Sequence, residues 1–554
     1  MSSWSIGQSG TAPRAFAPQG GLLRFCLGEP LDRHFWWVVV VAMLSAGARA
    51  WVANRLELFQ DESLYWYIGV FAPLTFSPHP PGLPLIARFG AALFGKTELA
   101  IRFGNVVLGS LALPLFYFLG RRILASSAVA WLATLAFALT PIYFAFGAIC
   151  TPDMPQLFFW VALLYATWRA IEGEELWWVL VGALFGVGLY FKYILILYAP
   201  ALVIYFLWSG ELWRALHSRF FRLGVFLALL LFFPVAVWRE AQTGWDALAY
   251  HLRDRQDFDF SPLRNGFVYF AVHLAYYSPL FYVGAIAGIV ASAWRAWRQR
   301  DWRLAYLATF GAVPFLFFAS IAFFTRRELS REQWDAPAYV AGLIAAAWLV
   351  RELMHGARTR VARLRFRALV QVAFVLAALT VAIVTTEAFT TLPSKLLGFR
   401  PLFSVMEGGR ALARRVDAIR TTLPAEAHTV VLGNSFIPAM QYAFYSKSTP
   451  KVFTLEHKHN RRYGLRGIIE RTGMSMRDLA QRTGVDAIFV ASGGPNEDST
   501  RKLAELKQRL LQYFEAVEVL PPLPILTNGR EIGRFYLLYC RRLYISASPS
   551  SRAE

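Results

Sequence analysis

Long apolar runs recur along this chain, separated by short polar segments. Each run has about 17–25 residues, enough for a helix to cross a hydrocarbon core roughly 30 Å thick. The runs at 176–208 and 304–324 contain almost no polar residues, so they lack the polar stripe of a helix in a water-soluble protein. Only 17% of the 554 residues are charged, against about a quarter in soluble domains. The sequence therefore predicts a polytopic α-helical membrane protein.

The distribution of arginine predicts how the spans are oriented. Basic residues favour the cytoplasmic side of a membrane, and arginine-rich segments alternate with arginine-poor ones along the chain. The richest is RELMHGARTRVARLRFR, directly before the last span. With the N-terminus inside the cell, an odd number of spans places the C-terminal part outside. The eleven predicted spans are 35–53, 99–119, 127–143, 155–171, 176–191, 194–208, 220–239, 268–292, 304–324, 336–353 and 369–387.

The chain divides into three predicted parts. They are a cytoplasmic N-terminal segment (1–34), a transmembrane domain with outer loops (35–388) and a soluble periplasmic α/β domain (389–554). The N-terminus lacks the positive and then apolar build of a cleaved signal peptide, so we expect the first span to be retained. In the last part, the residue pattern predicts strands at 428–435, 485–494 and 533–543 and a helix at 501–514.

The C-terminal domain is strongly basic. It has 24 lysines and arginines against 14 aspartates and glutamates, and this net charge of +10 is half of the chain's +20. A basic domain at a membrane surface suggests an anionic neighbour such as a phosphorylated lipid or glycolipid. Charge that serves solubility alone is the alternative. No nucleic acid partner is expected, because the domain is predicted outside the cell and has no nucleic-acid-binding motif.

Two adjacent carboxylates, Asp61 and Glu62, follow the first span in the stretch LELFQDESLYWY. A partly desolvated carboxylate with a raised pKa can take a proton from a hydroxyl group. Two neighbouring carboxylates could also hold a divalent cation. The alternative is a pair of ordinary carboxylates in an interfacial loop, where headgroups and water solvate the charge. The three cysteines, Cys26, Cys150 and Cys540, lie far apart and show no metal-binding spacing.

Two further charges lie where predicted spans begin or end. Asp153, in AICTPDMPQLFFW, stands between two prolines at the start of a span. It could cap the helix, take part in chemistry, or do both. Lys192 is the only charge between Glu175 and Glu211, and a lysine facing lipid at mid-depth is costly. It is therefore predicted either to snorkel from a turn or to anchor a phosphate.

The outer loops add a histidine and an arginine cluster. His79 lies in SPHPPGLPL, where prolines restrict the backbone, although a lone histidine is more often structural than catalytic. Arg326, Arg327 and Arg331, with Glu332, precede QWDAPAYVAGL. Guanidinium groups at the lipid boundary suit a phosphate or pyrophosphate, and helix-end charge is the alternative. All these candidates are predicted on one membrane face, as a single active site would require.

The order of these motifs resembles the GT-C superfamily of polyprenyl-phosphate-sugar-dependent glycosyltransferases. More narrowly, it is similar to the bacterial protein-mannosyltransferase-like family that includes the lipid A aminoarabinose transferases. No single motif is specific, but the set in this order is. The matching pieces span about residues 35–350: FQDESLYWY, HPPGLPLIARFGAALFGKTELAIRFGNVVLG, TPDMPQLFFWVALLYATWRAIE, GALFGVGLYFKYILILYAPALVIYFL and REQWDAPAYVAGLIAAAW. The region 400–554 matches no motif, though family members often carry an outer C-terminal domain.

The resemblance implies roles for individual residues. The acidic pair of the family falls on Asp61 and Glu62, with Asp61 as the base or the group that orients the acceptor. Its second outer aspartate falls on Asp153, and its lysine near the donor phosphate falls on Lys192. In the aminoarabinose transferases a Glu-Lys pair precedes the double proline, where this chain has Pro-His. The lost glutamate weakens any metal site built on it, whereas His79 can still touch phosphate.

The implied activity is that of an inverting glycosyltransferase of the bacterial inner membrane. A sugar would move from a polyprenyl (undecaprenyl) phosphate to an envelope acceptor such as lipid A, lipopolysaccharide or another glycan. Asp61 would take the proton of the attacking hydroxyl. Lys192 and Arg331 would stabilise the leaving phosphate, where preorganised cations lower the barrier, with His79 and Arg327 as further contacts. The expected cofactor is at most a divalent metal ion at the acidic pair.

Two other classes of function are open on the residues alone. A transporter or flippase for a lipid-linked sugar would need no base. Transporters often contain repeated halves with broken helices, and no such repeat is visible here. A non-catalytic protein could instead hold an anionic glycolipid on its basic outer domain. The exchange Asp61→Asn separates these functions, because only the transferase requires that carboxylate.

Overall fold

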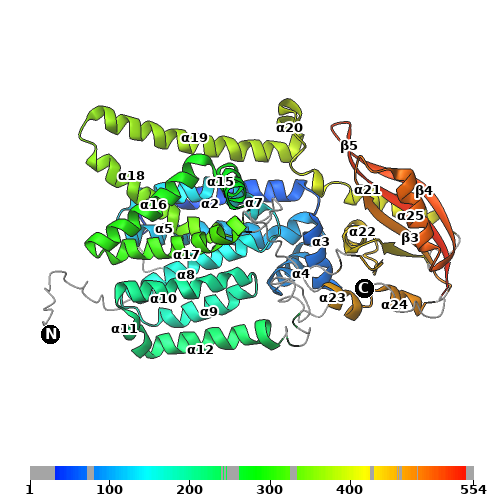
Figure 1. Ribbon diagram of the computed structural model, residues 1–554, viewed down its shortest axis with the longest axis horizontal. Helices are drawn as coiled ribbons and strands as arrows, with labels where there is room; N and C mark the ends of the chain where they lie inside the picture. Colours follow the sequence, from blue (N-terminus) through cyan, green and yellow to red (C-terminus); the bar gives the residue numbers. More distant parts are fainter. Residues whose placement is uncertain are drawn as a thin grey trace.

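The computed structural model shows a bundle of helices with a sheet-containing domain at one end (Figure 1). It describes residues 31–71, 80–238, 261–324, 333–423, 429–457, 465–482 and 484–544, with the single residues 241, 245 and 460. The two parts lie end to end along the longest axis, so the long helices point towards the C-terminal domain.

Six described helices are long and apolar enough to cross a membrane, and a bent pair of shorter helices raises the number to seven. The chain is thus a multi-pass membrane protein, as predicted, while the count of eleven spans stays a prediction. The six are α2 (Arg33–Arg55), α5 (Glu98–Leu124), α16 (Pro279–Gln299), α17 (Trp302–Phe324), α18 (Ala336–Gly356) and α19 (Arg360–Thr390). The bent pair is α6 (Ser127–Leu139) and α7 (Pro141–Ala148).

Shorter helices complete the bundle. Four of them run beside the long helices (Figure 1): α8 (Asp153–Ile171), α9 (Trp177–Leu189), α10 (Tyr198–Ser209) and α12 (Arg219–Phe233). The remaining elements of the bundle are α3 (Gln60–Phe71), α4 (Gly82–Phe94), η2 (Tyr193–Leu197), α11 (Leu212–His217), η3 (Pro234–Trp238) and α15 (Pro262–Tyr277).

Prolines divide two of the predicted spans. Between α6 and α7, Pro141 lacks the N–H that would continue the helix, and the chain turns by 60°. The prediction of one helix over 268–292 is wrong, because the chain breaks at Ser278 into α15 and α16. Pro279 disfavours helical backbone at the residue before it, and Ser278 has a φ of 69°. As a result, α15 lies crosswise and is seen end-on in Figure 1.

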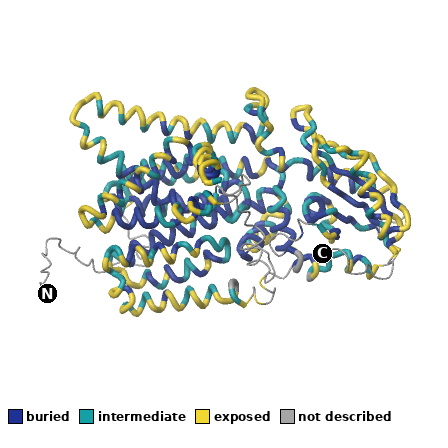
Figure 2. Tube along the Cα trace, in the orientation of Figure 1, coloured by how far each residue is buried: buried dark blue, intermediate teal, exposed yellow. Residues whose placement is uncertain are grey.

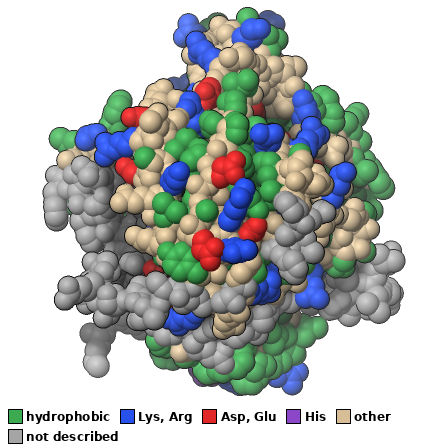
Figure 3. All heavy atoms as spheres, turned by 90° about the vertical axis from the view of Figure 1, so that its right-hand side faces the viewer, with side chains coloured by type: hydrophobic (Ala, Val, Ile, Leu, Met, Phe, Trp, Pro, Cys, Tyr) green, Lys and Arg blue, Asp and Glu red, His purple; other side chains and the backbone are tan. Residues whose placement is uncertain are grey.

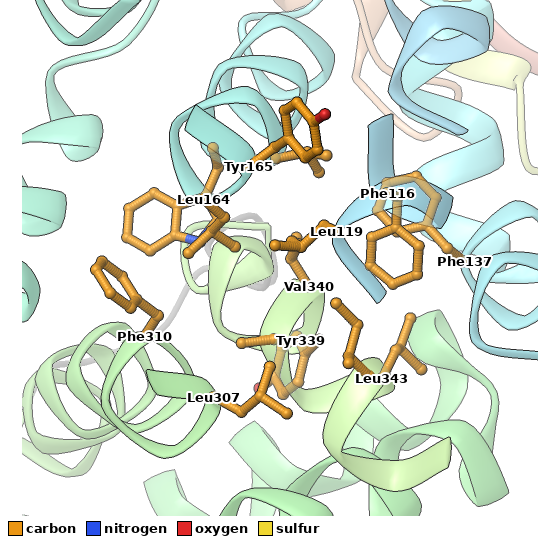
Figure 4. Packing of buried hydrophobic residues seen from close by; sticks show 14 of the residues in the cluster. Phe116, Leu119, Phe137, Leu164, Tyr165, Leu307, Phe310, Tyr339, Val340 and Leu343 are labelled. Carbon is orange, nitrogen blue, oxygen red and sulfur yellow. The ribbon is translucent and has the colours of Figure 1, made fainter. Parts of the chain in front are cut away.

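Close packing holds the bundle together, since lipid tails give helices little hydrophobic reason to associate. Figure 4 shows large side chains from different helices meeting in the main core, among them Phe116, Phe137, Leu164 and Phe310. Glycines allow the closest contacts: a Cβ on Gly182 of α9 would lie 1.9 Å from the carbonyl oxygen of α12 Gly224. The periphery of the bundle is exposed (Figure 2). Large apolar side chains such as Leu229 and Val290 are among the exposed residues, and only 6% of the most apolar window of α19 is buried, as lipid-facing helices require.

The C-terminal domain is built on one five-stranded sheet in the order β2-β1-β3-β5-β4. The first three of these strands are parallel, and β5 pairs antiparallel with both β3 and β4. This confirms the predicted α/β class. Its elements are α20 (Leu392–Leu397), η5 (Ser404–Met406), α21 (Gly409–Thr422), β1 (Thr429–Gly433), α22 (Phe436–Tyr445), β2 (Phe453–Thr454), α23 (Leu465–Arg471), α24 (Met476–Ala480), β3 (Asp486–Gly493), α25 (Ser499–Leu510), β4 (Phe514–Thr527) and β5 (Arg530–Leu543).

Candidate active site

The acidic pair opens helix α3, at the end of the bundle that faces the C-terminal domain (Figure 1). Carboxylates are favourable there, because the first turn of a helix presents unpaired N–H groups. The Oε2 atom of Glu62 accepts a hydrogen bond of 2.8 Å from the backbone N–H of Phe59. The two carboxylates differ in access: Asp61 is half-buried, whereas Glu62 is fully buried.

Glu62 forms a buried ion pair with Arg102 of α5. The guanidinium donates from Nε to Oε1 at 2.7 Å and from Nη2 to Oε2 at 2.6 Å, the two-pronged geometry that makes such pairs strong. The backbone N–H of Cys150 also donates to Oε1, at 2.6 Å. Both oxygens of Glu62 are therefore occupied and shielded from solvent. This geometry favours a structural role over the catalytic role expected from the sequence.

The same geometry does not fit a metal ion held by Asp61 and Glu62. A metal ligand needs a free lone pair directed at the ion, and the Glu62 oxygens already accept hydrogen bonds from Arg102, Phe59 and Cys150. Among the described residues, no group of three or more His, Cys, Asp or Glu could hold a metal. No metal-dependent step is therefore derived for this site.

Arg102 also fixes the turn between α2 and α3. Its Nη1 donates to the carbonyls of Ala53 and Leu56 at 2.6 and 2.8 Å, and its Nη2 donates to the carbonyl of Glu57 at 2.7 Å. The last carbonyls of a helix have no partner within that helix, so the guanidinium satisfies the end of α2. The direction in which the chain enters α3, and hence the place of Asp61, depends on this residue.

Asn105 lies one helical turn after Arg102 on α5 and holds the turn that precedes Asp153. Its Nδ2 donates to the carbonyls of Ile149 and Thr151 at 2.7 and 2.8 Å. These residues link α7 to α8, and α8 begins at Asp153. Because residues three apart on a helix share a face, Arg102 and Asn105 let α5 position the segments that carry Asp61 and Asp153.

Asp153 and Lys192 form the ion pair of the site. Lys192 Nζ lies 2.6 Å from Asp153 Oδ1, and the two side chains are only 12% and 6% exposed. Lys192 has extended backbone and lies directly after the turn at Tyr190 and Phe191 and directly before η2. The neighbouring turn is tied to the proline-rich segment by a 2.7 Å hydrogen bond from Gly82 N to the Tyr190 carbonyl. A Cβ at Gly82 would lie 2.5 Å from Phe191, so this close contact requires glycine.

A second buried cluster joins the crosswise helix α15 to the start of α18. His273 Nε2 lies 2.9 Å from Asp335 Oδ1, and both residues are almost fully buried. The hydroxyl of Tyr339 donates to Asp335 Oδ2 at 2.7 Å, and the Tyr269 hydroxyl donates to the same oxygen. The Tyr143 hydroxyl of α7 donates to the Ala336 carbonyl at 2.7 Å. The cluster thus anchors the chain directly after the predicted arginine segment.

The C-terminal domain packs on the other side of α3. The hydroxyl of Tyr445 accepts a 2.7 Å hydrogen bond from Leu58 N, and that of Tyr67 accepts one of 3.3 Å from Val452 N. The rings of Trp66 and Phe444 meet edge to face at 5.0 Å. Buried side chains of α3 and α4 form one continuous apolar core with the sheet domain. Helix α3 is therefore held from both sides.

The structure brings together some of the predicted residues and adds others. Asp153 pairs with Lys192, and the turn of Glu62 is bonded to the turn before Asp153. His79, Arg327 and Arg331 lie outside the described residues, as do Arg326 and Glu332. Sequence reasoning missed the polar residues Arg102, Asn105, His273 and Asp335. For Arg102, Asn105 and His273 the signal was present, because a polar residue inside an apolar span must find a partner there. Asp335 lies directly before α18 and carries no such signal.

Comparison with known proteins agrees with this architecture. The profile of the dolichyl-phosphate-mannose-protein mannosyltransferase family matches residues 78–238. An undecaprenyl phosphate-alpha-4-amino-4-deoxy-L-arabinose arabinosyl transferase of Erwinia tasmaniensis is 27% identical over 334 residues, which cover 58% of this chain and 57% of that protein. A second such transferase, from Proteus mirabilis, is 26% identical over 270 residues, 46% of this chain and 47% of that protein. The chain thus matches about half the length of these curated relatives.

Solved structures show the fold. The crystal structure of ArnT from Cupriavidus metallidurans bound to undecaprenyl phosphate superposes with a TM-score of 0.59 at 16% identity, covering 91% of this chain and 98% of that one. The oligosaccharyltransferase of Archaeoglobus fulgidus superposes with a TM-score of 0.51 at 12% identity, covering 85% and 71%. The chain has the GT-C fold, and the resemblance to the aminoarabinose transferases is confirmed. These findings and the apolar helices indicate a multi-pass protein of the bacterial inner membrane.

We predict that Glu62→Gln strongly destabilises the protein. The exchange leaves Arg102 charged and buried without its counter-charge, and breaking a buried pair from one side costs about 3–5 kcal/mol. Unfolding in detergent, followed by temperature or denaturant, measures the loss. The control is Glu505→Gln in the exposed pair with Arg501, where the change should stay below about 1 kcal/mol. Equal losses in both variants would contradict the structural role of Glu62.

We predict that Glu57, in the turn between α2 and α3, makes the stability of the protein depend on pH. Burial raises the pKa of this carboxyl above its usual 4.5 despite the nearby Arg410. A raised pKa means that the contribution of Glu57 to stability is full below pH 4.5 and is lost as pH rises through the folded-state value. Glu57→Gln should therefore stabilise the protein at neutral pH, with the gain disappearing in acid.

The free energy of unfolding of both proteins, measured across this pH range, tests the effect of Glu57. The matched control is Glu515→Gln, whose carboxylate is exposed in the C-terminal domain and should give no pH-dependent difference. A less stable Glu57→Gln protein at neutral pH would mean that attraction to Arg410 outweighs the cost of burial.

Proposed function

We propose that the protein is an inverting glycosyltransferase that moves a sugar from undecaprenyl phosphate to an envelope acceptor such as lipid A. The observation that carries the proposal is the hydrogen bond from Cys150 N to Glu62 Oε1. It joins the turn of the half-buried Asp61 to the turn that leads into Asp153, whose partner is Lys192. A candidate base and a candidate phosphate-binding cation thus belong to one bonded unit at one end of the bundle. The resemblance to the arabinosyl transferases supports this reading.

Asp61 is the proposed general base. It differs from its neighbour Glu62 in being partly accessible, and α3 holds it next to the outer boundary of the apolar bundle. The acceptor hydroxyl attacks the anomeric carbon on the face opposite the phosphate. The bond from that carbon to the phosphate oxygen breaks, its electron pair stays on the phosphate, and Asp61 takes the hydroxyl proton.

Lys192 is the proposed cation for the leaving lipid phosphate. Its ammonium group is a compact charge on a flexible stem, so it can turn from Asp153 towards an incoming phosphate. The pair holds this lysine in place inside an apolar region until the donor arrives. Charge that builds on the phosphate in the transition state is then met by a cation already in position. His79, Arg327 and Arg331 remain proposed further contacts.

The proposed orientation puts the N-terminus in the cytoplasm and the C-terminal domain in the periplasm. The arginine-rich stretch that ends α18 and begins α19 supports it, because such stretches stay on the cytoplasmic side. The opposite end of the bundle carries the candidate site and faces the C-terminal domain. The outer surface of that domain displays lysines and arginines among acidic and apolar side chains (Figure 3). Its net charge of +10 over 389–554 favours an acceptor that carries phosphate, as lipid A does.

We predict that Asp61→Asn lowers the transfer rate by about 10²- to 10⁴-fold, the usual contribution of a general base. The assay uses purified protein in nanodiscs, extracted envelope glycolipid and a panel of undecaprenyl-phosphate sugars that includes 4-amino-4-deoxy-L-arabinose. Glu211→Gln is the control, because this acid lies in an exposed pair at the far end of the bundle and should leave the rate unchanged.

Three results of this assay are informative. Loss in Asp61→Asn alone supports the enzyme and its base, and the productive donor identifies the sugar. Equal rates in wild type and variant remove Asp61 from the mechanism and make Asp153 the next candidate. Binding of the lipid-linked sugars without any transfer would favour a transporter or a binding protein instead.

We predict that exchanges at Asp153 and at Lys192 have opposite effects on donor binding. Lys192→Gln should weaken the binding of undecaprenyl phosphate by removing a charge-assisted contact, whereas Asp153→Asn should strengthen it by releasing the lysine from its partner. Lys192→Arg should retain most of the binding. Quenching or calorimetric titration of each purified variant with undecaprenyl phosphate measures these changes. If Lys192→Gln binds as tightly as wild type, the lysine has only a structural role.

A further inference from the structure

The segment between the last apolar helix and the sheet domain exposes an unusual number of large apolar side chains. Leu396 and Leu397 of α20 are 73% and 71% exposed. Soluble surfaces rarely gather such residues in one place without a partner. We call the set the juxtamembrane patch, and it comprises Leu392, Leu396, Leu397, Leu402, Val405 and, from the end of β4, Leu526.

The patch lies at the outer end of a lipid-facing helix. α19 is the most apolar of the candidate spans and ends at Thr390, and α20 begins at Leu392. Two residues of chain reach only about 7 Å, so α20 cannot be far from the surface of the hydrocarbon core. In Figure 1, α20 projects sideways from the end of α19, beyond the bundle, where lipid would surround the helices. Figure 2 shows it as exposed.

The position of the patch is fixed rather than loose. Glu387, in the last turn of α19, is buried, and its Oε2 accepts a 2.9 Å hydrogen bond from Ser394 N. Its Oε1 accepts a 3.4 Å hydrogen bond from Leu402 N. The carboxylate thus ties α20 and the segment after it to α19. These hydrogen bonds give the exposed leucines a defined orientation.

The tip of the β4–β5 hairpin adds a second part to the patch. Thr391 Oγ1 donates to Asn528 Oδ1 at 2.5 Å, so the hairpin tip lies beside α20. Leu526 is 60% exposed at this tip, and Arg530 is exposed next to it. Lys395 is exposed on α20. Apolar side chains accompanied by cations are the pattern of segments that lie in the membrane interface, where the cations meet lipid phosphates.

We propose that the juxtamembrane patch inserts its leucines into the outer leaflet, with Lys395 and Arg530 at the headgroup phosphates. This contact sets the height of the sheet domain above the bilayer. That domain packs on α3 through Tyr445 and Phe444, so the patch also sets the depth at which α3 lies. The proposal concerns lipid contact alone and does not depend on the proposed transferase activity.

Site-directed fluorescence in nanodiscs tests the contact. An environment-sensitive label on Leu396→Cys should shift its emission to the blue and be quenched by brominated phospholipid. Leu511→Cys is the control, because Leu511 is also exposed but lies beyond the far end of β4, whose 14 residues extend about 45 Å. Cys150 and Cys540 are buried, and unsubstituted protein labelled in parallel gives the background.

Quenching at Leu396→Cys well above that at Leu511→Cys supports insertion. The absence of such a difference in nanodiscs that contain this protein alone would overturn the proposal and indicate a protein partner for the patch. A second comparison tests the cations: exchanging Lys395 and Arg530 for glutamine should reduce the quenching in nanodiscs of anionic lipid and have less effect in zwitterionic ones. Equal effects in both lipids would exclude the headgroup contact.

Discussion

The buried pair of Arg102 and Glu62 is the interaction on which the end of the bundle that faces the C-terminal domain depends. Burying two charges in an apolar region is costly unless every remaining donor and acceptor is also satisfied. Arg102 meets that condition by donating to Glu62 and to three carbonyls at the end of α2. Glu62 completes the network through the N–H of Cys150. The turns before α3 and α8 are therefore joined through this ion pair. The pair thus helps to position the candidate base and the candidate cation.

The C-terminal domain packs against the same region. Phe444 contacts α3, and Tyr445 contacts the turn before it. Together with the proposed lipid contact of α20, these contacts place the candidate site between the helix bundle and the sheet domain. This arrangement suits chemistry on a donor whose tail stays in the bilayer. The proposed lipid carrier cannot leave the membrane, so a transferase that uses it must hold its reactive groups at a fixed depth.

The correct predictions concern features that are visible in a short window of sequence, whereas the missed features depend on the sheet or on the packing of helices. The strands β1, β3 and β5 and the helix α25 were predicted because side-chain alternation and helical periodicity are visible in a short window. Strand β4 was missed, since Pro521 and Pro522 argue against a strand; it lies at the edge of the sheet, where proline is tolerated. The break at Ser278 was missed because hydropathy records the length of an apolar run and not its direction. His273 and Asp335 were missed because a sequence shows a polar residue in or beside an apolar run but does not show which partner it meets.

The sequence by itself determined that this is a multi-pass membrane protein with an α/β domain at its end. The length of an apolar run and the placement of arginines can be read locally in the sequence. The bilayer constrains both in each segment separately. Only the tertiary structure decided which polar groups meet: Asp153 with Lys192, 39 residues away, and Glu62 with Arg102, 40 residues away. Inside an apolar bundle a charge is stable only beside its partner, and which partner lies in reach depends on how helices distant in the sequence pack together.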